Sequence, residues 1–306
     1  MDLESPTVLV LGAGGIIGEA WMAGLLAGLS EASDFDPRQC DSFVGTSAGS
    51  IVAAGLAAGI DPRSRLGRLP EQPPATPSGD DGSLFGAALR FGRDASAVAA
   101  APIAALALRS TELGGAAVRR TALSRVPTGQ RSLAQVGRAI KDMGAAWDGR
   151  LFVATVELES GRRVVFGGAD ERRLSVADAV QASCAIPGVF RPISAGGRTY
   201  VDGGAWSLTN MDVAPVERGS RVLCLNPTGS LSGTATLRGA IGPLSRSVAA
   251  VEALTLQRRG AQVTTLAPDS EATRAMGSDF MDPRNRERAQ AAGFAQGHRA
   301  VAQLAA

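Results

Sequence analysis

Histidine is scarce in this chain: His298 is the only one among 306 residues, and it lies in a segment rich in alanine, glutamine and glycine near the carboxyl end. A histidine in such a segment is more often a surface residue than a catalytic one. Because histidine is the usual general base for a serine nucleophile, an ordinary histidine-based site is not expected. A carboxylate can take the same role when burial raises its pKa toward neutrality.

Cysteine is also scarce, and positive and negative charges nearly balance. The three cysteines, Cys40, Cys184 and Cys224, are widely spaced, which suits a reducing compartment and gives no metal-ligand spacing. The formal net charge is +2 at pH 7, and no block of basic residues stands alone. We therefore expect no metal site and no nucleic-acid partner.

Long apolar runs are absent as well. No uninterrupted run reaches the roughly 18 residues that span a bilayer, and the nearest, residues 95–108, contains Pro102. Residues 1–4 are acidic and lack the basic-then-apolar layout of a signal peptide. We expect a cytoplasmic protein without a signal peptide or transmembrane helix, whose contact with a membrane would be peripheral.

Short β-favouring runs alternate with helical runs along most of the chain, which predicts a single α/β domain over residues 1–306. The expected sheet is mostly parallel, with helices on both faces, and residues 151–166 are expected to form a hairpin. Strands are predicted at 7–11, 42–44, 151–156, 163–166, 199–201, 221–225 and 262–266, and helices at 19–31, 51–58, 132–147, 175–183, 244–259 and 284–305.

Residues 60–146 interrupt this alternation. Prolines predict a flexible loop over residues 60–82, and helical runs follow over 83–146. This insertion either caps a site or packs against the sheet as an ordinary core element. One part of it would suit a flap at a lipid surface, because apolar side chains are flanked by arginines: Leu84, Phe85, Ala88, Leu89, Phe91 and residues 95–108, with Arg90, Arg93 and Arg109.

Residues 45–49 read Gly-Thr-Ser-Ala-Gly between a predicted strand and a predicted helix. This arrangement is typical of a nucleophile elbow, in which Ser47 would stand at the apex of a strained turn. Gly45 and Gly49 would let the two arms approach closely. The alternative is an ordinary strand-to-helix turn, since a chain rich in glycine and alanine produces this pattern by chance.

A second glycine-rich turn, residues 12–18, follows the strand predicted at 7–11. Such a turn presents backbone N–H groups to an anion, either a dinucleotide phosphate or an oxyanion. A dinucleotide site requires a second strand that ends in an acid about 20 residues later. Here a polar turn with Pro37 follows instead, which argues against an oxidoreductase and leaves the oxyanion hole or a plain tight turn.

Asp202 is the best-placed carboxylate for the role of base. It follows the strand predicted at 199–201, and active sites of parallel sheets gather at the carboxyl ends of their strands. Gly203 and Gly204 would let the chain turn away beside it. The alternative is a common Asp-Gly turn.

Together these motifs resemble the patatin-like phospholipases, which are lipid acyl hydrolases. The glycine turn with Gly12 and Gly18, the elbow and the Asp202-Gly203-Gly204 triplet occur in the family's order, and residues 182–192 are similar to the stretch that precedes the family's aspartate. The resemblance covers about residues 7–226. It implies a patatin-like three-layer sandwich with a helical insertion.

The resemblance also implies a Ser-Asp dyad that cleaves lipid esters without a metal or other cofactor. Carried over, Ser47 attacks the acyl carbonyl, Asp202 takes its proton, and the N–H groups of Gly14 and Gly15, with Ala13, hold the oxyanion. The substrate would be a phospholipid, a lysophospholipid or a neutral lipid. The oligomeric state is left open.

Two residues depart from the family pattern. Ala13 replaces a glycine, and Ile17 stands where the family usually has a basic residue. Loss of that cation would weaken binding of an anionic head group. Together with the long helical insertion, the change at Ile17 keeps one alternative open: a catalytically idle protein of this fold that binds lipid or a partner.

Overall fold

The computed structural model describes residues 6–66, 112–167, 174–230 and 241–305. Much of the 60–146 insertion, including every residue assigned above to the lipid flap, lies outside the described residues. No helix in the described part is long and apolar enough to cross a membrane.

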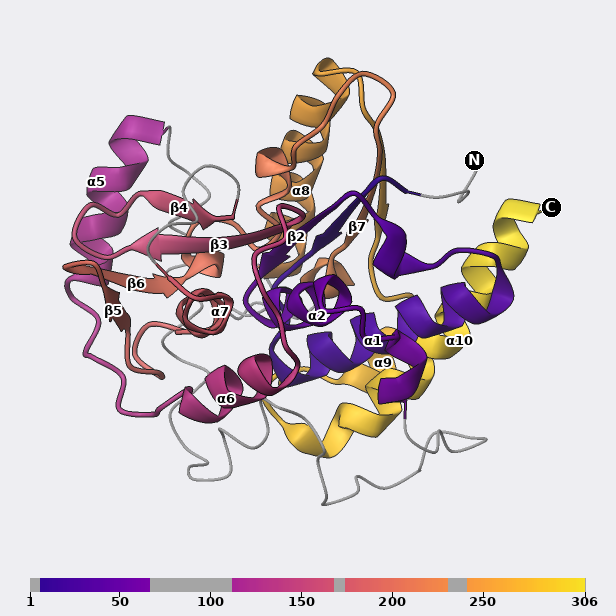
Figure 1. Ribbon diagram of the computed structural model, residues 1–306, viewed down its shortest axis with the longest axis horizontal. Helices are drawn as coiled ribbons and strands as arrows, with labels where there is room; N and C mark the ends of the chain where they lie inside the picture. Colours follow the sequence, from indigo (N-terminus) through magenta and orange to yellow (C-terminus); the bar gives the residue numbers. More distant parts are fainter. Residues whose placement is uncertain (1–5, 67–111, 168–173, 231–240, 306) are drawn as a thin grey trace.

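The centre of the molecule is an eight-stranded sheet in the order β5-β6-β3-β2-β1-β7-β8, with β4 paired to β3 (Figure 1). The run from β3 to β8 is parallel, whereas β4, β5 and β6 join by antiparallel pairing. The strands are β1 (Val8–Leu11), β2 (Ser42–Thr46), β3 (Leu151–Glu157), β4 (Arg163–Phe166), β5 (Ile193–Ala195), β6 (Arg198–Asp202), β7 (Arg221–Leu225) and β8 (Gln262–Leu266). The mostly parallel sheet and the β3–β4 hairpin are confirmed.

Helices cover both faces, which confirms the three-layer sandwich. Alternation along β1 divides the core: Leu9 and Leu11 pack into the larger cluster with α1, α2, α7 and α10, while Val8 and Val10 face α8. The helices are α1 (Gly15–Ala32), α2 (Ala48–Ala57), α5 (Glu112–Leu123), α6 (Ala134–Asp142), α7 (Val176–Ser183), α8 (Ile241–Arg258), α9 (Ser270–Met276) and α10 (Arg286–Ala305).

One strand runs opposite to expectation. Asp202 was expected at the carboxyl end of a strand in the parallel part of the sheet, but β6 pairs antiparallel with β3. A second antiparallel pair lies next to it, the β5–β6 hairpin, whose turn is Gly196-Gly197, both with positive φ. A Gly-Gly pair between two β-favouring runs is the signal that would have predicted this hairpin, whereas nothing local sets the direction of β6 against β3.

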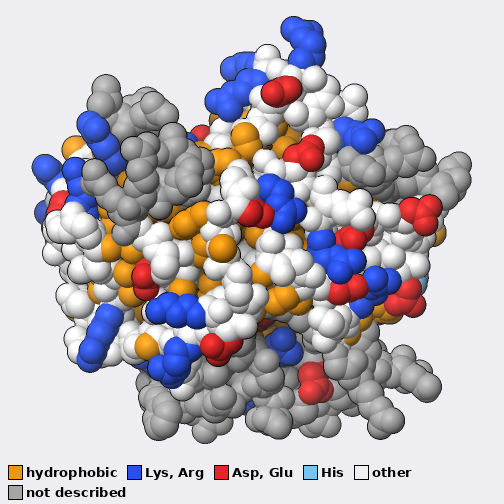
Figure 2. All heavy atoms as spheres, viewed as in Figure 1, with side chains coloured by type: hydrophobic (Ala, Val, Ile, Leu, Met, Phe, Trp, Pro, Cys, Tyr) orange, Lys and Arg blue, Asp and Glu red, His pale blue; other side chains and the backbone are white. Residues whose placement is uncertain are grey.

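Several surface charges form ion pairs. On the face shown in Figure 2, basic and acidic side chains are interspersed. Three Asp-Pro-Arg triplets, at residues 36–38, 61–63 and 282–284, repeat one local structure in which the aspartate accepts the arginine's backbone N–H and also pairs with its guanidinium at 2.8, 2.6 and 2.6 Å. The proline suits the first position of each short 3₁₀ turn.

Helix α1, which carries the glycine turn at its amino end, packs directly on α10 through small residues. A β-carbon on Gly24 or Gly28 would lie 2.1 or 2.2 Å from the carbonyl oxygens of Gln290 and Phe294. The indole N–H of Trp21 also donates to Gln296 Oε1 at 2.9 Å. Because the two helix backbones touch at these glycines, a side chain there would push α1 away from α10.

We predict that Gly28→Ala lowers the free energy of unfolding by about 1–3 kcal/mol through overpacking, even though alanine is favoured in a helix by about 1 kcal/mol. Gly137→Ala in α6 is the matched control, because its β-carbon would meet only the flexible amide end of Gln181. Urea unfolding of both variants checks this. Equal stability for the two would contradict the packing argument.

Candidate functional site

Ser47 stands between β2 and α2 with φ 52° and ψ −122°, a conformation that L residues rarely adopt. The flanking glycines make this turn possible. A β-carbon on Gly45 would lie 2.5 Å from the Ser50 Cα, and one on Gly49 would lie 2.0 Å from the Leu11 carbonyl oxygen. The geometry is that of the strained elbow anticipated from the sequence.

Hydrogen bonds hold this strained turn in place. The Ser47 N–H donates to Ser183 Oγ at 2.8 Å, and the Ser183 hydroxyl donates to the Ala154 carbonyl on β3 at 2.7 Å. The Ser50 hydroxyl donates to the Ser47 carbonyl at 2.6 Å. Both backbone groups of Ser47 are thereby fixed, which leaves its hydroxyl as the group free to react. Ser183 is the last residue of α7 and belongs to the 182–192 stretch noted in the sequence, but no role for its side chain was expected.

The Ser47 hydroxyl donates to Asp202 Oδ2 at 2.7 Å. The other carboxylate oxygen, Oδ1, accepts the Gly204 N–H at 2.7 Å, and the Asp202 N–H donates to the Ala185 carbonyl at 3.0 Å. Ser47 is 3% exposed and Asp202 5%. The two side chains that the sequence singled out, 155 positions apart, therefore form one buried pair.

Burial raises the pKa of Asp202 to about 7, because its charged form loses hydration; the hydrogen bonds from Gly204 and Ser47 lower the pKa and only partly offset this effect. A carboxyl group with a pKa near 7 is divided between its protonated and ionised forms at neutral pH. It can therefore accept a proton from a hydroxyl and return it, as general acid–base chemistry requires.

The sheet register explains how an antiparallel strand delivers this aspartate. Thr46 pairs with Ala154, and the next residue of β3, Thr155, pairs with Asp202. Strand β6 thus enters from the far end of β3 and ends at the level where β2 ends. Asp202 therefore lies at the end of β2 because β6 ends there, and not because it follows a strand of the parallel part of the sheet.

The glycine turn lies between β1 and α1. Its first two N–H groups are engaged, Gly12 with the Leu225 carbonyl at 2.9 Å and Ala13 with the Leu208 carbonyl at 2.7 Å. This corrects the expectation for Ala13, whose N–H is not available to an oxyanion in this conformation. The N–H groups of Gly14 and Gly15, at the start of α1, have no hydrogen-bond partner in the described part of the chain.

Residues beyond the recognised motifs complete this turn. Pro227 packs against Gly14 and Gly18, where an added β-carbon would lie 2.8 and 3.0 Å from the Pro227 Cβ. The Phe280 carbonyl accepts the Ile17 N–H at 3.2 Å. A β-carbon on Gly15 would lie 2.7 Å from Met281 Sδ. No motif in the sequence pointed to Pro227 or to residues 280–281.

Two other candidates are placed away from this chemistry. Ile17, where a basic residue was looked for, is fully buried in the main core. His298 contacts Phe294 within α10, with ring centroids 4.8 Å apart and the ring planes tilted by 56°, whereas the partner of the Ser47 hydroxyl is Asp202. Among the described residues, no cluster of three or more histidines, cysteines or acids could hold a metal ion.

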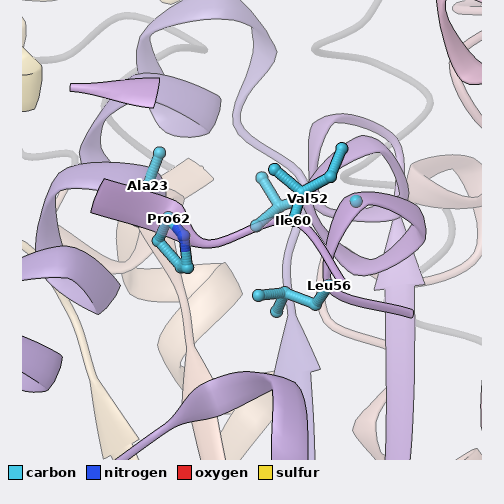
Figure 3. Close-up of a pocket in the computed structure, with 6 residues that line it drawn as sticks. Ala23, Val52, Leu56, Ile60 and Pro62 are labelled. Carbon is cyan, nitrogen blue, oxygen red and sulfur yellow. The ribbon is translucent and has the colours of Figure 1, made fainter. Parts of the chain in front are cut away.

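A small apolar crevice lies between α1, α2 and the turn after α2 (Figure 3). Its volume is about 10 Å³, roughly the space of one water molecule. Its lining residues are Ala23, Val52, Gly55, Leu56, Ile60 and Pro62. The crevice is too small for an acyl chain and does not include Ser47 or Asp202.

We predict that Ser47→Gly is more stable than Ser47→Ala by about 1–2 kcal/mol, because glycine accepts the positive φ and alanine retains the strain. Both variants lack the hydroxyl, so the comparison isolates the backbone. Thermal and urea unfolding measure it. If Ser47→Ala is as stable as Ser47→Gly, the turn stores no strain.

Comparison with known proteins places most of this chain in one family. The family model of the patatin-like phospholipases matches residues 9–215. Solved structures that resemble the chain include VipD from Legionella pneumophila, with 16% identity and a TM-score of 0.44, and the type III effector protein ExoU, with 18% identity and a TM-score of 0.40. The matches cover 97% of this chain and 67% and 53% of those chains. No curated protein sequence matches significantly.

Proposed function

Because the chain belongs to the patatin-like phospholipase family, we propose that it is a serine acyl hydrolase that cleaves the ester bonds of lipids. One observation carries the proposal: the Ser47 hydroxyl donates to a buried carboxyl, Asp202, whose pKa is raised to about 7. Family membership supports lipid ester hydrolysis in general, and the proposal assigns it to this pair. The substrate class is phospholipid, lysophospholipid or neutral lipid.

In the first half of the reaction, Ser47 Oγ attacks the acyl carbonyl carbon while its proton moves to Asp202. The tetrahedral intermediate collapses as Asp202 passes that proton to the leaving alcohol oxygen, and an acyl ester remains on Ser47. Water then attacks this ester with Asp202 as the base, and the proton returns to Ser47 as the free acid leaves. No cofactor enters this scheme.

The oxyanion that forms in both halves would be held by the N–H groups of Gly14 and Gly15. Their position at the amino end of α1 adds the positive end of the helix dipole. The Ala13 N–H is engaged by Leu208 and takes no part. Pro227, packed against Gly14 and Gly18, keeps the turn rigid.

Contact with a membrane surface is part of the proposal, because lipid esters reside in aggregates. The apolar and basic residues expected to make that contact, residues 84–109, lie outside the described residues, so this role remains a prediction. The same holds for a single domain over residues 1–306.

We predict that Ser47→Ala and Asp202→Asn each lower hydrolysis of p-nitrophenyl esters by about 10⁴-fold or more, as loss of a nucleophile or its base does in serine hydrolases. Esters of short to long chain, assayed with purified protein, measure this. Ser30→Ala and Asp34→Asn, remote changes of the same chemical type, should retain full activity. An inert wild type would instead favour the catalytically idle, lipid- or partner-binding alternative.

We predict that kcat/KM falls as pH decreases through about 7, since only ionised Asp202 accepts the serine proton. The titration of Asp202 has the opposite effect on the stability of the fold, which it lowers as pH rises. Between pH 4 and 7 the folded chain binds more protons at Asp202 than the unfolded chain, so the free energy of unfolding falls as pH rises. Glu252, buried with its pKa also raised to about 7, adds to that trend.

Rate profiles and unfolding curves from pH 4 to 9 test both halves of this prediction. Asp202→Asn should reduce the pH dependence of stability and should leave the part due to Glu252. An acid limb centred near pH 4 would show that burial does not raise the pKa of the base.

A further inference from the structure

Resting on the proposed function, we infer that Asn210 is a positioning residue that holds Ser47 and Asp202 at hydrogen-bonding distance. Its side-chain amide ties together the immediate neighbours of both. Asn210 Nδ2 donates to Thr46 Oγ1 at 3.1 Å and to the Gly203 carbonyl at 3.3 Å. Thr46 directly precedes Ser47, and Gly203 directly follows Asp202.

The amide has one chemically sensible orientation. Nδ2 also donates to the Ser207 carbonyl at 2.6 Å, so its two hydrogens serve three acceptors and one of them is shared. Carbonyl oxygens only accept, so the nitrogen must face this side. On the other side, Oδ1 accepts from Arg163 Nη1 at 3.3 Å. Arg163 is itself fixed by two 2.6 Å hydrogen bonds to Asp212. The side chain is 0% exposed, so water does not compete for these bonds.

The loop that carries Asn210 is anchored from the opposite face of the sheet. Glu252 on α8 accepts the Met211 N–H at 2.9 Å and the hydroxyl of Thr209. The Thr46 hydroxyl, in turn, donates to the Thr209 carbonyl at 3.3 Å. The loop therefore cannot drift away from the end of β2 without breaking bonds to both α8 and Thr46.

The backbone conformation of Asn210 allows substitutions that change the side-chain amide and leave the loop conformation intact. It lies in the left-handed region, φ 48° and ψ 34°, which glycine and aspartate also tolerate. Asn210→Gly therefore keeps the loop conformation and removes the amide. Asn210→Asp keeps the shape and replaces the donor with an acceptor that faces the carbonyls of Gly203 and Ser207.

The test compares kcat, KM and the crystal structures of Asn210→Gly and Asn210→Asp with those of the wild type. We expect both variants to lower kcat about 10–100-fold, the cost of a small misplacement of reacting groups, with KM within twofold of the wild type. We also expect the Ser47 Oγ–Asp202 Oδ2 distance to exceed the 2.7 Å of the native chain.

Val222→Ala is the matched control for lost stability. Val222 is buried in β7 and pairs with Val8 at the end of the sheet away from Ser47. This variant should lose stability and keep its kcat. If Asn210→Asp keeps wild-type kcat and spacing, or if the Asn210 variants lose no more kcat than Val222→Ala, the positioning role is wrong.

If the proposed hydrolase activity is wrong, the same experiments give a different set of results. A wild type that is inert toward every ester refutes the hydrolase proposal alone. The Ser47–Asp202 distance in the Asn210→Gly crystal structure then still decides the positioning role: a widened distance supports it, and an unchanged distance overturns it.

Discussion

Burial of the Asp202 carboxyl beneath the Ser47 hydroxyl is the constraint on which the rest of this structure depends. A charged carboxylate that is 5% exposed loses most of its hydration, and burial of such a group is costly unless hydrogen bonds satisfy it. The Ser47 hydroxyl and the Gly204 N–H supply two such bonds. They do not restore the ordinary pKa, which stays raised to about 7, the range that a general base needs at neutral pH.

The residues around Ser47 and Asp202 hold this pair in place. Ser47 is held at a positive φ, and residues in such conformations persist only when their surroundings over-determine them. Here Ser183 fixes the Ser47 N–H, and the glycines on either side of the turn let β2 and α2 approach closely. Asn210 links Thr46 and Gly203, the neighbours of Ser47 and Asp202. These contacts hold Ser47 and Asp202 next to each other.

Local signals predicted much of this arrangement, and long-range pairing accounts for what was missed. The elbow and the Asp-Gly-Gly triplet are short motifs whose residue types reflect the backbone conformation they require. Ser47 and Asp202 could therefore be named from the sequence, and the helix expected at 175–183 matches α7. Strand direction is set by the partner strand, so β6 was misjudged. The engagement of Ala13 depends on Leu208, nearly two hundred positions away, and the packing of residues 280–281 on the glycine turn carries no local signature at all.

The central claim, that Ser47 is a nucleophile activated by Asp202, is tested most directly by covalent labelling. Purified protein is treated with a fluorophosphonate at pH 8, and mass spectrometry locates the adduct in the wild type and in Asp202→Asn. The account predicts one adduct, on Ser47, that forms rapidly in the wild type and far more slowly in the variant. An unlabelled Ser47, or equal labelling rates in the two proteins, would contradict it.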